Sequence, residues 1–236
     1  MKAFKSILLC GAVLAAGLFT AQNASAQFNP VSGQSVNLGS NVEYNIGIGF
    51  GINFPMGIAD DDIYSPMQKA WGLDFSFNFA EFYWSGLSKA NQFFLTLGLE
   101  NRSFRMRDNW GYGMTPITEE LAMVPYNDLK MSALRVFSWN VGMGYRAVLD
   151  DDLDFMIGPI VNFNTASRMK TKYYDEHGDF HREKIKRWNH HELVTIEAMA
   201  RLNFKGIGLY VKYNPFPLID KEYGPEFTTW SVGIML

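Results

Sequence analysis

The stretch from Val42 to Phe54 reads VEYNIGIGFGINF, and two kinds of residue alternate along its whole length. Every even position carries a large apolar side chain, whereas the odd positions carry Glu43, Asn45, Asn53 and three glycines. A period of two over so many residues is typical of a β-strand with two unlike faces. This stretch therefore predicts a strand with an apolar environment on one side and a crowded polar environment on the other.

The same alternation recurs seven more times, in the segments 71–79, 93–99, 137–145, 153–163, 194–204, 207–213 and 230–236. The connections between the segments alternate in length: long ones at 55–70, 108–130, 167–189 and 215–225, short ones at 85–91, 149–152 and 205–206. Long loops at one end and tight turns at the other are typical of an up-and-down meander. The sequence therefore predicts an all-β fold, an eight-stranded antiparallel up-and-down barrel over residues 41–236.

The composition supports a β-rich chain. Of the 236 residues, 47% are hydrophobic, 15% aromatic and 19% charged, and the net charge is -3. A disordered chain would be poor in aromatic residues, and a helical bundle would not favour so much glycine and aromatic content. The slightly acidic charge argues against a general nucleic-acid partner.

Residues 1–26 predict a cleaved secretory signal peptide, followed by a periplasmic N-terminal segment at 27–40. A basic start, an apolar run and an A-x-A cleavage site follow one another in order: Lys2, Lys5, residues 7–19, Ala24 and Ala26. The single cysteine, Cys10, lies in the apolar run and would leave with the signal. Disulfides and thiol chemistry are then excluded from the mature chain.

The apolar face of the predicted strands indicates contact with lipid. It carries no charge, whereas the opposite face is mostly Gly, Asn, Ser and Thr, which suit a narrow lumen. Aromatic residues gather near the strand ends, as in the two girdles of membrane barrels: Tyr44, Trp71, Tyr145, Phe163, Phe204, Tyr213 and Trp230. We therefore expect a transmembrane barrel in the outer membrane, with both termini periplasmic. The alternatives are a soluble periplasmic lipocalin-like ligand-binding barrel and a small-solute pore, the latter disfavoured by the strand number.

Strand parity also predicts charges inside the barrel. The inward positions include four acids and four bases: Glu43, Asp74, Glu100, Arg102, Arg146, Glu197, Arg201 and Lys212. An unpaired buried charge is very costly, so we expect these groups to pair and to plug the lumen. Such a network can be purely structural, or it can form a gated polar path for small ions.

The long connection 167–189 is strongly basic. Its cations are Arg168, Lys170, Lys172, Arg182, Lys184, Lys186 and Arg187. Residues 176–179, with Gly178 free to adopt positive φ, predict the tip of a β-ribbon that extends above the membrane. The ribbon is a candidate surface for anionic lipopolysaccharide or for an acidic protein partner, and a solubilising role is the alternative.

Other clusters offer weaker signals. All four histidines lie between 177 and 191 (His177, His181, His190 and His191), but their spacing matches no metal motif. The acidic runs 60–62 and 150–152 lack the spacing of a calcium loop. We therefore expect no metal and no cofactor. Residues 118–121 predict one short helix in the loop 108–130.

The pattern as a whole resembles the PorT-like small outer-membrane β-barrel proteins of Gram-negative bacteria. The resemblance rests on the signal peptide, the eight alternating segments and the C-terminal pair of strands, 209–215 and 230–236. The last strand, which ends at Leu236, is similar to the signal that the barrel-assembly machinery reads. Some members of the family are linked to protein secretion. The resemblance thus implies an outer-membrane location and biogenesis by that machinery.

The sequence contains no nucleophile elbow, no phosphate-binding glycine loop and no H-E-x-x-H motif. We therefore expect a protein that is not an enzyme. The predicted role is structural, or is exerted through the extracellular loops in adhesion or as an accessory to protein export or assembly.

Overall fold

The computed structural model describes residues 36–39, 42–60, 62–85, 90–186, 188 and 190–236. The signal peptide and the cleavage residues predicted at 1–26 lie outside the described residues, as do Asp61 and Arg187. In the segment predicted to be periplasmic, residues 36–39 form a short strand, and the rest lies outside the described residues.

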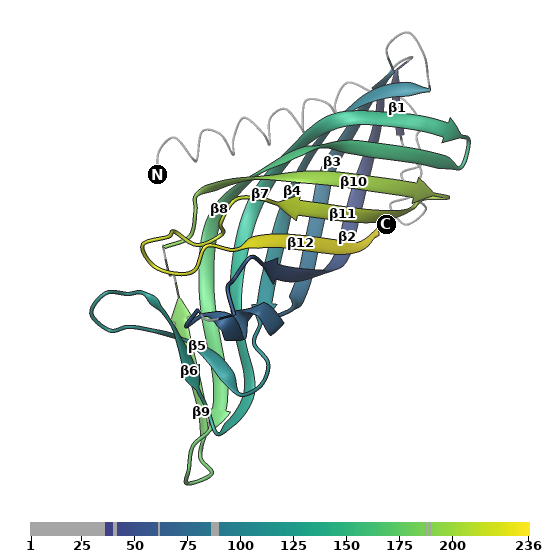
Figure 1. Ribbon diagram of the computed structural model, residues 1–236. Helices are drawn as coiled ribbons and strands as arrows, with labels where there is room; N and C mark the ends of the chain where they lie inside the picture. Colours follow the sequence, from purple (N-terminus) through teal and green to yellow (C-terminus); the bar gives the residue numbers. More distant parts are fainter. Residues whose placement is uncertain (1–35, 40–41, 61, 86–89, 187, 189) are drawn as a thin grey trace.

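The described chain is nearly all β, and eight of its strands close into a ring (Figure 1). The order around the ring is β2-β12-β11-β10-β8-β7-β4-β3, and pairing of β3 with β2 closes it. The ring strands are β2 (Val42–Met56), β3 (Gly72–Ser85), β4 (Asn91–Arg105), β7 (Asp128–Asp150), β8 (Leu153–Tyr174), β10 (Val194–Phe204), β11 (Ile207–Asn214) and β12 (Thr228–Met235). Each of the eight predicted segments falls on one ring strand, so the predicted barrel fold is confirmed.

Four smaller strands lie outside the ring. They are β1 (Val36–Gly39), which pairs with β2, a hairpin of β5 (Trp110–Met114) and β6 (Leu121–Pro125), and β9 (Phe180–Lys186), which pairs with β8. A 3-10 helix, η1 (Ser65–Lys69), lies in the connection from β2 to β3. Among the described residues, no helix has the length and apolarity needed to cross a membrane.

The two ends of the ring differ, as the alternating connections predicted. The end with the short connections, called the turn end, holds the turn at 205–206 and the C-terminal Leu236. The opposite end, called the loop end, carries all four long connections. Strands β7 and β8 have 23 and 22 residues and continue past the ring, where β9 joins them in a three-stranded ribbon (Figure 1).

The ribbon has the predicted hairpin tip, but the helix predicted at 118–121 is wrong. Gly178 has a φ of +82° at the tip. Residues 115–120 instead form the turn of the β5–β6 hairpin, closed by a hydrogen bond from the Thr115 N–H to the Glu120 carbonyl oxygen. Glu119 has a φ of +58°, a left-handed conformation that cannot continue a right-handed helix.

The long connections fold onto one another at the loop end. Their apolar residues bury a common cluster, called the loop core, together with inward residues of the ring strands. It comprises Ile58, Met67, Ala70, Phe104, Met106, Tyr112, Leu121, Leu134, Val136, Met169, Trp188, Leu218, Ile219 and Phe227. The loop end is therefore filled by an apolar core, in contrast to the polar interior nearer the turn end.

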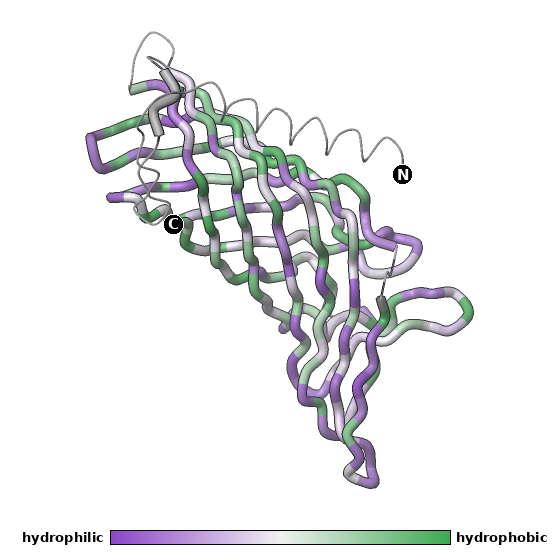
Figure 2. Tube along the Cα trace, turned by 180° about the vertical axis from the view of Figure 1, so that it is seen from behind, coloured by the Kyte–Doolittle hydropathy of each residue, from purple (hydrophilic) through white to green (hydrophobic). Residues whose placement is uncertain are grey.

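The outward face of the ring is apolar. Each of the eight ring strands exposes large hydrophobic side chains there, for example Phe50 on β2, Phe93 on β4 and Val232 on β12. Figure 2 shows the alternation of apolar and hydrophilic residues along the ring strands and the hydrophilic character of the ribbon below them. We call this outward surface the apolar belt. Its side chains are exposed while acids and bases are buried inside, which reverses the arrangement of ordinary soluble proteins.

A β-bulge in β3 changes which side chains of that strand face inward. Asn78 pairs with Gly98 on β4, but the next pair is Ala80 with Leu97, so one extra residue, Phe79, stands on β3. Even positions face the interior before the bulge, and Glu81 and Tyr83 face it afterwards. Strict alternation continued past Phe79 would place Glu81 and Tyr83 on the outer face.

Deletion of Phe79 should destabilise the barrel. Without the extra residue, only one of the two halves of β3 can keep its polar side chains inside. The reason is that a shift of one residue exchanges the two faces of a strand. Loss of one buried ion pair alone would cost about 3–5 kcal/mol. Denaturant unfolding monitored by tryptophan fluorescence measures the loss. Deletion of Glu176, at the exposed ribbon tip, is the control, and equal stability of the two variants would contradict the role of the bulge.

Candidate functional site

The barrel interior holds two networks of charged side chains. The first, called the central network, consists of Asp74, Glu100, Arg102, Glu197 and Lys212, all at least 97% buried. The second, called the turn-end network, consists of Glu43, Glu81, Arg146, Asp154 and Arg201. Along β10 the inward positions run from Glu197 through Met199 to Arg201, so an apolar residue separates the two networks on that strand.

The central network joins strands from opposite sides of the ring. The Lys212 ammonium on β11 donates to Asp74 on β3 at 2.9 Å and also to Glu100 on β4. The Arg102 guanidinium donates to Glu197 on β10 and, at 3.2 Å, to the Asn164 side-chain oxygen on β8. Three carboxyl groups thus share two cations in a buried site, so removal of either cation would leave buried negative charge without compensation.

The turn-end network is built around two arginines. Arg201 holds Glu81 with both ends of its guanidinium, at 3.0 and 3.1 Å, and also donates to the Tyr83 hydroxyl at 2.9 Å. Arg146 pairs with Asp154 at 2.8 Å and with Glu43 at 3.3 Å. The forked guanidinium satisfies two carboxylate oxygens at once, which makes it suited to a buried pair.

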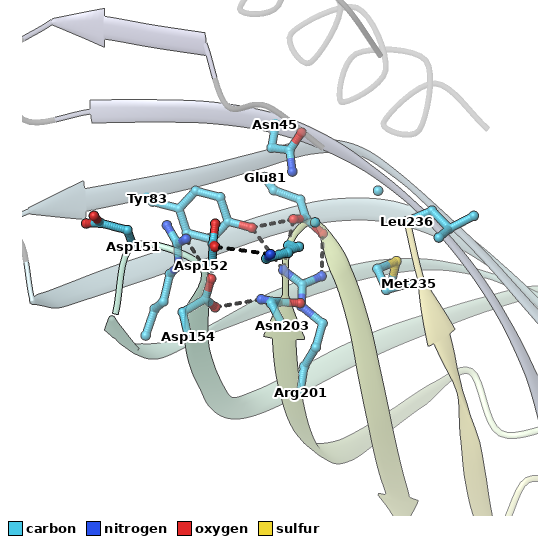
Figure 3. Close-up of a pocket in the computed structure, with 14 residues that line it drawn as sticks. Asn45, Glu81, Tyr83, Asp151, Asp152, Asp154, Arg201, Asn203, Met235 and Leu236 are labelled. Atoms are coloured by element: carbon cyan, nitrogen blue, oxygen red, sulfur yellow. Dashed lines mark hydrogen bonds and ion pairs between the residues drawn. The ribbon is translucent and has the colours of Figure 1, made fainter. Parts of the chain in front are cut away.

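A cavity of about 490 Å³ lies over the turn-end network. Figure 3 shows Glu81, Arg201, Asp154 and Asn203 at the cavity wall. Arg201 is hydrogen-bonded to Glu81, and Asn203 is hydrogen-bonded to Asp154. The wall also includes residues of two tight turns and of the C-terminus: Asp151, Asp152, Lys205, Gly206, Met235 and Leu236. The cavity is therefore a polar cup at the turn end, with acids and bases mixed on its wall.

Small residues make room for the interior side chains. A Cβ atom on Gly51 would lie 2.4 Å from the Tyr210 hydroxyl oxygen, and one on Gly142 would lie 2.4 Å from the Thr96 hydroxyl oxygen. Real Cβ atoms do not approach other atoms so closely, so these positions exclude larger residues unless neighbours shift. The glycines on the polar face of the strands thus give space to polar side chains from neighbouring strands, as the narrow lumen requires.

All eight charged residues predicted from parity point into the ring, and the structure adds two acids. Asp154 was on a predicted strand but was not assigned to the network, and its inward alternation was the signal that could have found it. Glu81 could not be found by parity, because the bulge at Phe79 reverses the alternation before it. The described interior charges therefore number six acids and four bases instead of four and four.

The predicted girdle residues lie on the outer face at two levels. Tyr44, Tyr145 and Phe204 are near the turn end, whereas Trp71, Phe163, Tyr213 and Trp230 are near the loop end. Tyr213 and Trp230 are paired across β11 and β12, with ring centroids 4.6 Å apart. Trp139 pairs with Phe163 across β7 and β8, and its ring meets Phe79 with the centroids 6.3 Å apart.

The four histidines do not gather. His177 is exposed at the ribbon tip, and the His181 ring lies 2.8 Å from the Asp175 carboxylate. His190 contacts Glu119 at 2.7 Å, while both ring nitrogens of the buried His191 lie 3.2 Å from backbone carbonyl oxygens. In the part of the chain that the structure describes, no group of three or more His, Cys, Asp or Glu residues could hold a metal ion.

The Asp175 carboxylate fixes the tip of the ribbon. The hydrogen bond with the His181 ring and the backbone N–H groups of Asp179 and His177 lower its pKa, because each favours the charged carboxylate. The tip is thus a locally stabilised turn.

Comparison of the chain with models of known protein families and with curated proteins found no match. The resemblance to the PorT-like family therefore stays a prediction from the sequence pattern.

Replacement of Arg201 by Met should cost about 3–5 kcal/mol of unfolding free energy, because Glu81 would remain as a buried charge without its partner. The double variant Arg201→Met with Glu81→Leu should recover much of this loss, since neither charge remains. Lys69→Met is the control, because its pair with Asp108 is exposed and should contribute about 0–1 kcal/mol. Denaturant unfolding of the three variants measures the differences. A double variant no more stable than Arg201→Met would argue against pairing as the main contribution.

Proposed function

We propose that this chain is an integral outer-membrane β-barrel protein with a closed interior, which anchors a folded extracellular ribbon in the membrane. The apolar belt carries the proposal, because every ring strand exposes large hydrophobic residues while ten charged side chains lie inside. A closed ring leaves no unpaired strand edge, and this is the condition for strands to cross lipid. The short turns and the termini would then be periplasmic, and the long connections would face outward.

The alternative of a soluble ligand-binding barrel fits the side chains poorly. Such a barrel would turn its apolar face inward around a ligand, whereas here the interior is occupied by ion pairs and the apolar side chains point outward. The belt would also be a far larger exposed apolar surface than soluble monomers usually carry. These observations favour lipid as the environment of the belt.

The loop core and the two networks favour a plugged barrel over a pore. Eight strands leave a lumen just wide enough for side chains, and here charged groups and the loop core fill it. The proposal therefore gives the protein a structural role or a role exerted through its loop end, in adhesion or as an accessory to export or assembly. We also propose that the chain is a member of the PorT-like group and has no catalytic activity.

A lysine on the apolar belt tests the membrane environment. Phe50 on β2 is 50% exposed and packs its ring 5.3 Å from Phe75, and Phe180 on the ribbon is 52% exposed and lies 5.4 Å from the Tyr174 ring. Phe50→Lys should cost about 2–4 kcal/mol in a bilayer, as for charges facing the middle of the lipid. Phe180→Lys should change stability by about 0.5 kcal/mol or less.

The measurement is urea unfolding of the protein reconstituted in phospholipid vesicles. The two phenylalanines are matched in exposure and in aromatic neighbours, so general loss of packing would affect them alike. Equal effects of the two substitutions would refute the membrane proposal.

Planar-bilayer recording tests the plug. We expect the inserted protein to give no sustained single-channel openings, because charged pairs and the loop core occupy the lumen. Flotation of protein-containing vesicles serves as the control for insertion. Large stable openings from protein that floats with the vesicles would contradict a closed interior while leaving the membrane location intact.

A further inference from the structure

The ribbon carries cations on one face, directly opposite one another. This basic face consists of Arg135 on β7, Arg168, Lys170 and Lys172 on β8, and Arg182 and Lys184 on β9. Arg135 pairs in register with Arg168, Lys170 with Lys184, and Lys172 with Arg182. Like charges directly opposite each other on a sheet are destabilising. A ribbon that served only to remain soluble would gain from acids at some of these positions.

The acids of the ribbon do not neutralise this face. Glu183 lies between Arg182 and Lys184 on β9 and therefore on the other face of the ribbon. It accepts a hydrogen bond from the Tyr173 hydroxyl at 2.9 Å. Within the described residues, five of the cations form no ion pair with an acid: Arg135, Arg168, Lys170, Lys172 and Arg182. The basic face therefore concentrates positive charge, although the chain as a whole has a net charge of -3.

A hollow of about 210 Å³ lies among these cations. Arg135, Arg168, Lys170, Arg182 and Lys184 line it with Met169 and Ile185, and no acid is among the described lining residues. Partial burial, and then the neighbouring Arg182, Lys172, Lys184 and Arg135, lower the pKa of Lys170. An anion in the hollow would relieve this repulsion between cations.

The opposite face of the ribbon is covered. There the Ser132 hydroxyl accepts a hydrogen bond from the Tyr112 N–H of the β5–β6 hairpin, and the Thr171 hydroxyl donates to the Tyr112 carbonyl oxygen. Met169 and Leu134 belong to the loop core on this side. Beside the hairpin, the open face is therefore the one that carries the cations, whereas Glu183 on β9 stays exposed on the other face.

The basic face is continuous with the apolar belt. On β7, Arg135 follows Phe137 and Trp139 on the same outward face, and Trp139 is level with the girdle residue Phe163 on β8. Successive outward residues on a strand are about 7 Å apart. The first cations thus lie one to two outward positions past the belt. The headgroup region extends about 5–8 Å beyond the hydrocarbon on each side, so the nearer of these cations would stand at the level of lipid phosphates.

We infer that the basic face binds the phosphate groups of an anionic glycolipid in the outer leaflet that surrounds the barrel. The inference rests on the proposed function, because only a membrane barrel has lipid at this level. Guanidinium groups hold phosphate through two parallel hydrogen bonds, and lysines add compact positive charge. The cations farther along the ribbon, Lys172 and Arg182, would contact additional anionic groups above the first.

Native mass spectrometry of the folded protein in detergent micelles tests the inference with diphosphoryl lipid A as the probe. We expect the protein to bind this lipid and not to bind the same lipid with both phosphates removed. Each cation near an anionic lipid contributes about a fivefold factor in affinity. The triple variant Arg168→Gln, Lys170→Gln and Arg182→Gln should therefore bind about a hundredfold more weakly, and raised salt should weaken wild-type binding as well.

The matched control removes three exposed lysines elsewhere, with Lys69→Gln, Lys205→Gln and Lys221→Gln, and should keep wild-type affinity. Equal loss in the control variant, or equal binding of the dephosphorylated lipid, would overturn the inference. Displacement of the lipid by inorganic pyrophosphate at equal concentration would show a site for free phosphate instead. Tighter binding of poly-glutamate than of the lipid would show a site for an acidic protein.

Failure of this inference is distinguishable from failure of the proposed function. If the protein does not float with phospholipid vesicles, the proposed function is contradicted. Protein that floats, and that nevertheless binds lipid A without regard to its phosphates, fails only the inference about the basic face.

Discussion

Closure of the ring between β2 and β3 is the constraint on which the rest of the structure depends. Once eight strands close, every strand of the ring has a hydrogen-bonded neighbour on both sides, and the space inside is fixed by the strand number. That space admits side chains and little else. A charged side chain inside the ring must therefore pair with a side chain from another strand. Lys212 on β11 pairs with Asp74 on β3, and Arg201 on β10 pairs with Glu81 on β3. These pairs cross the lumen, so they tie distant strands together while they fill it.

The same constraint explains the division of polarity between the two faces. The interior can hold charges because they are paired, and it needs glycines such as Gly51 because the space is narrow. The outer face has no such partners, and it is apolar on every strand. At the loop end the interior changes from charged to apolar, because the long connections supply their own hydrophobic residues and bury them against Phe104 and Leu134. The barrel is thus filled by two different devices, ion pairs toward the turn end and a loop core at the other end.

Much of this arrangement could be predicted from the sequence, because a period of two is a local signal. The alternation in Val42 to Phe54 and its seven repeats located every ring strand, and parity located eight inward charges. The alternation did not predict the inward position of Glu81, because no feature of the sequence indicates the single extra residue at Phe79. The loop core could not be predicted either, since Met67, Leu121 and Leu218 follow no period and meet only through tertiary packing. The short helix expected at 118–121 gave way to a hairpin turn, because pairing of β5 with β6 sets the backbone there and Glu119 adopts a left-handed conformation.

The length of β7 and β8 connects the barrel to its extension. Both strands continue past the ring, so the alternation that places Phe163 on the outer face also governs the residues beyond it. A second irregularity intervenes, since Phe137 pairs with Ala166 while Ser138 pairs with Asn164, so Thr165 is an extra residue on β8. This bulge shifts the outward positions from odd to even numbers and thereby aims Arg168, Lys170 and Lys172 outward and Met169 and Thr171 inward. Without it, the cations would point into the loop core, where their burial would be prohibitive. One inserted residue thus keeps the apolar core intact and sets the cations at a fixed height above the apolar belt, on a strand whose register is held by β7 and β9.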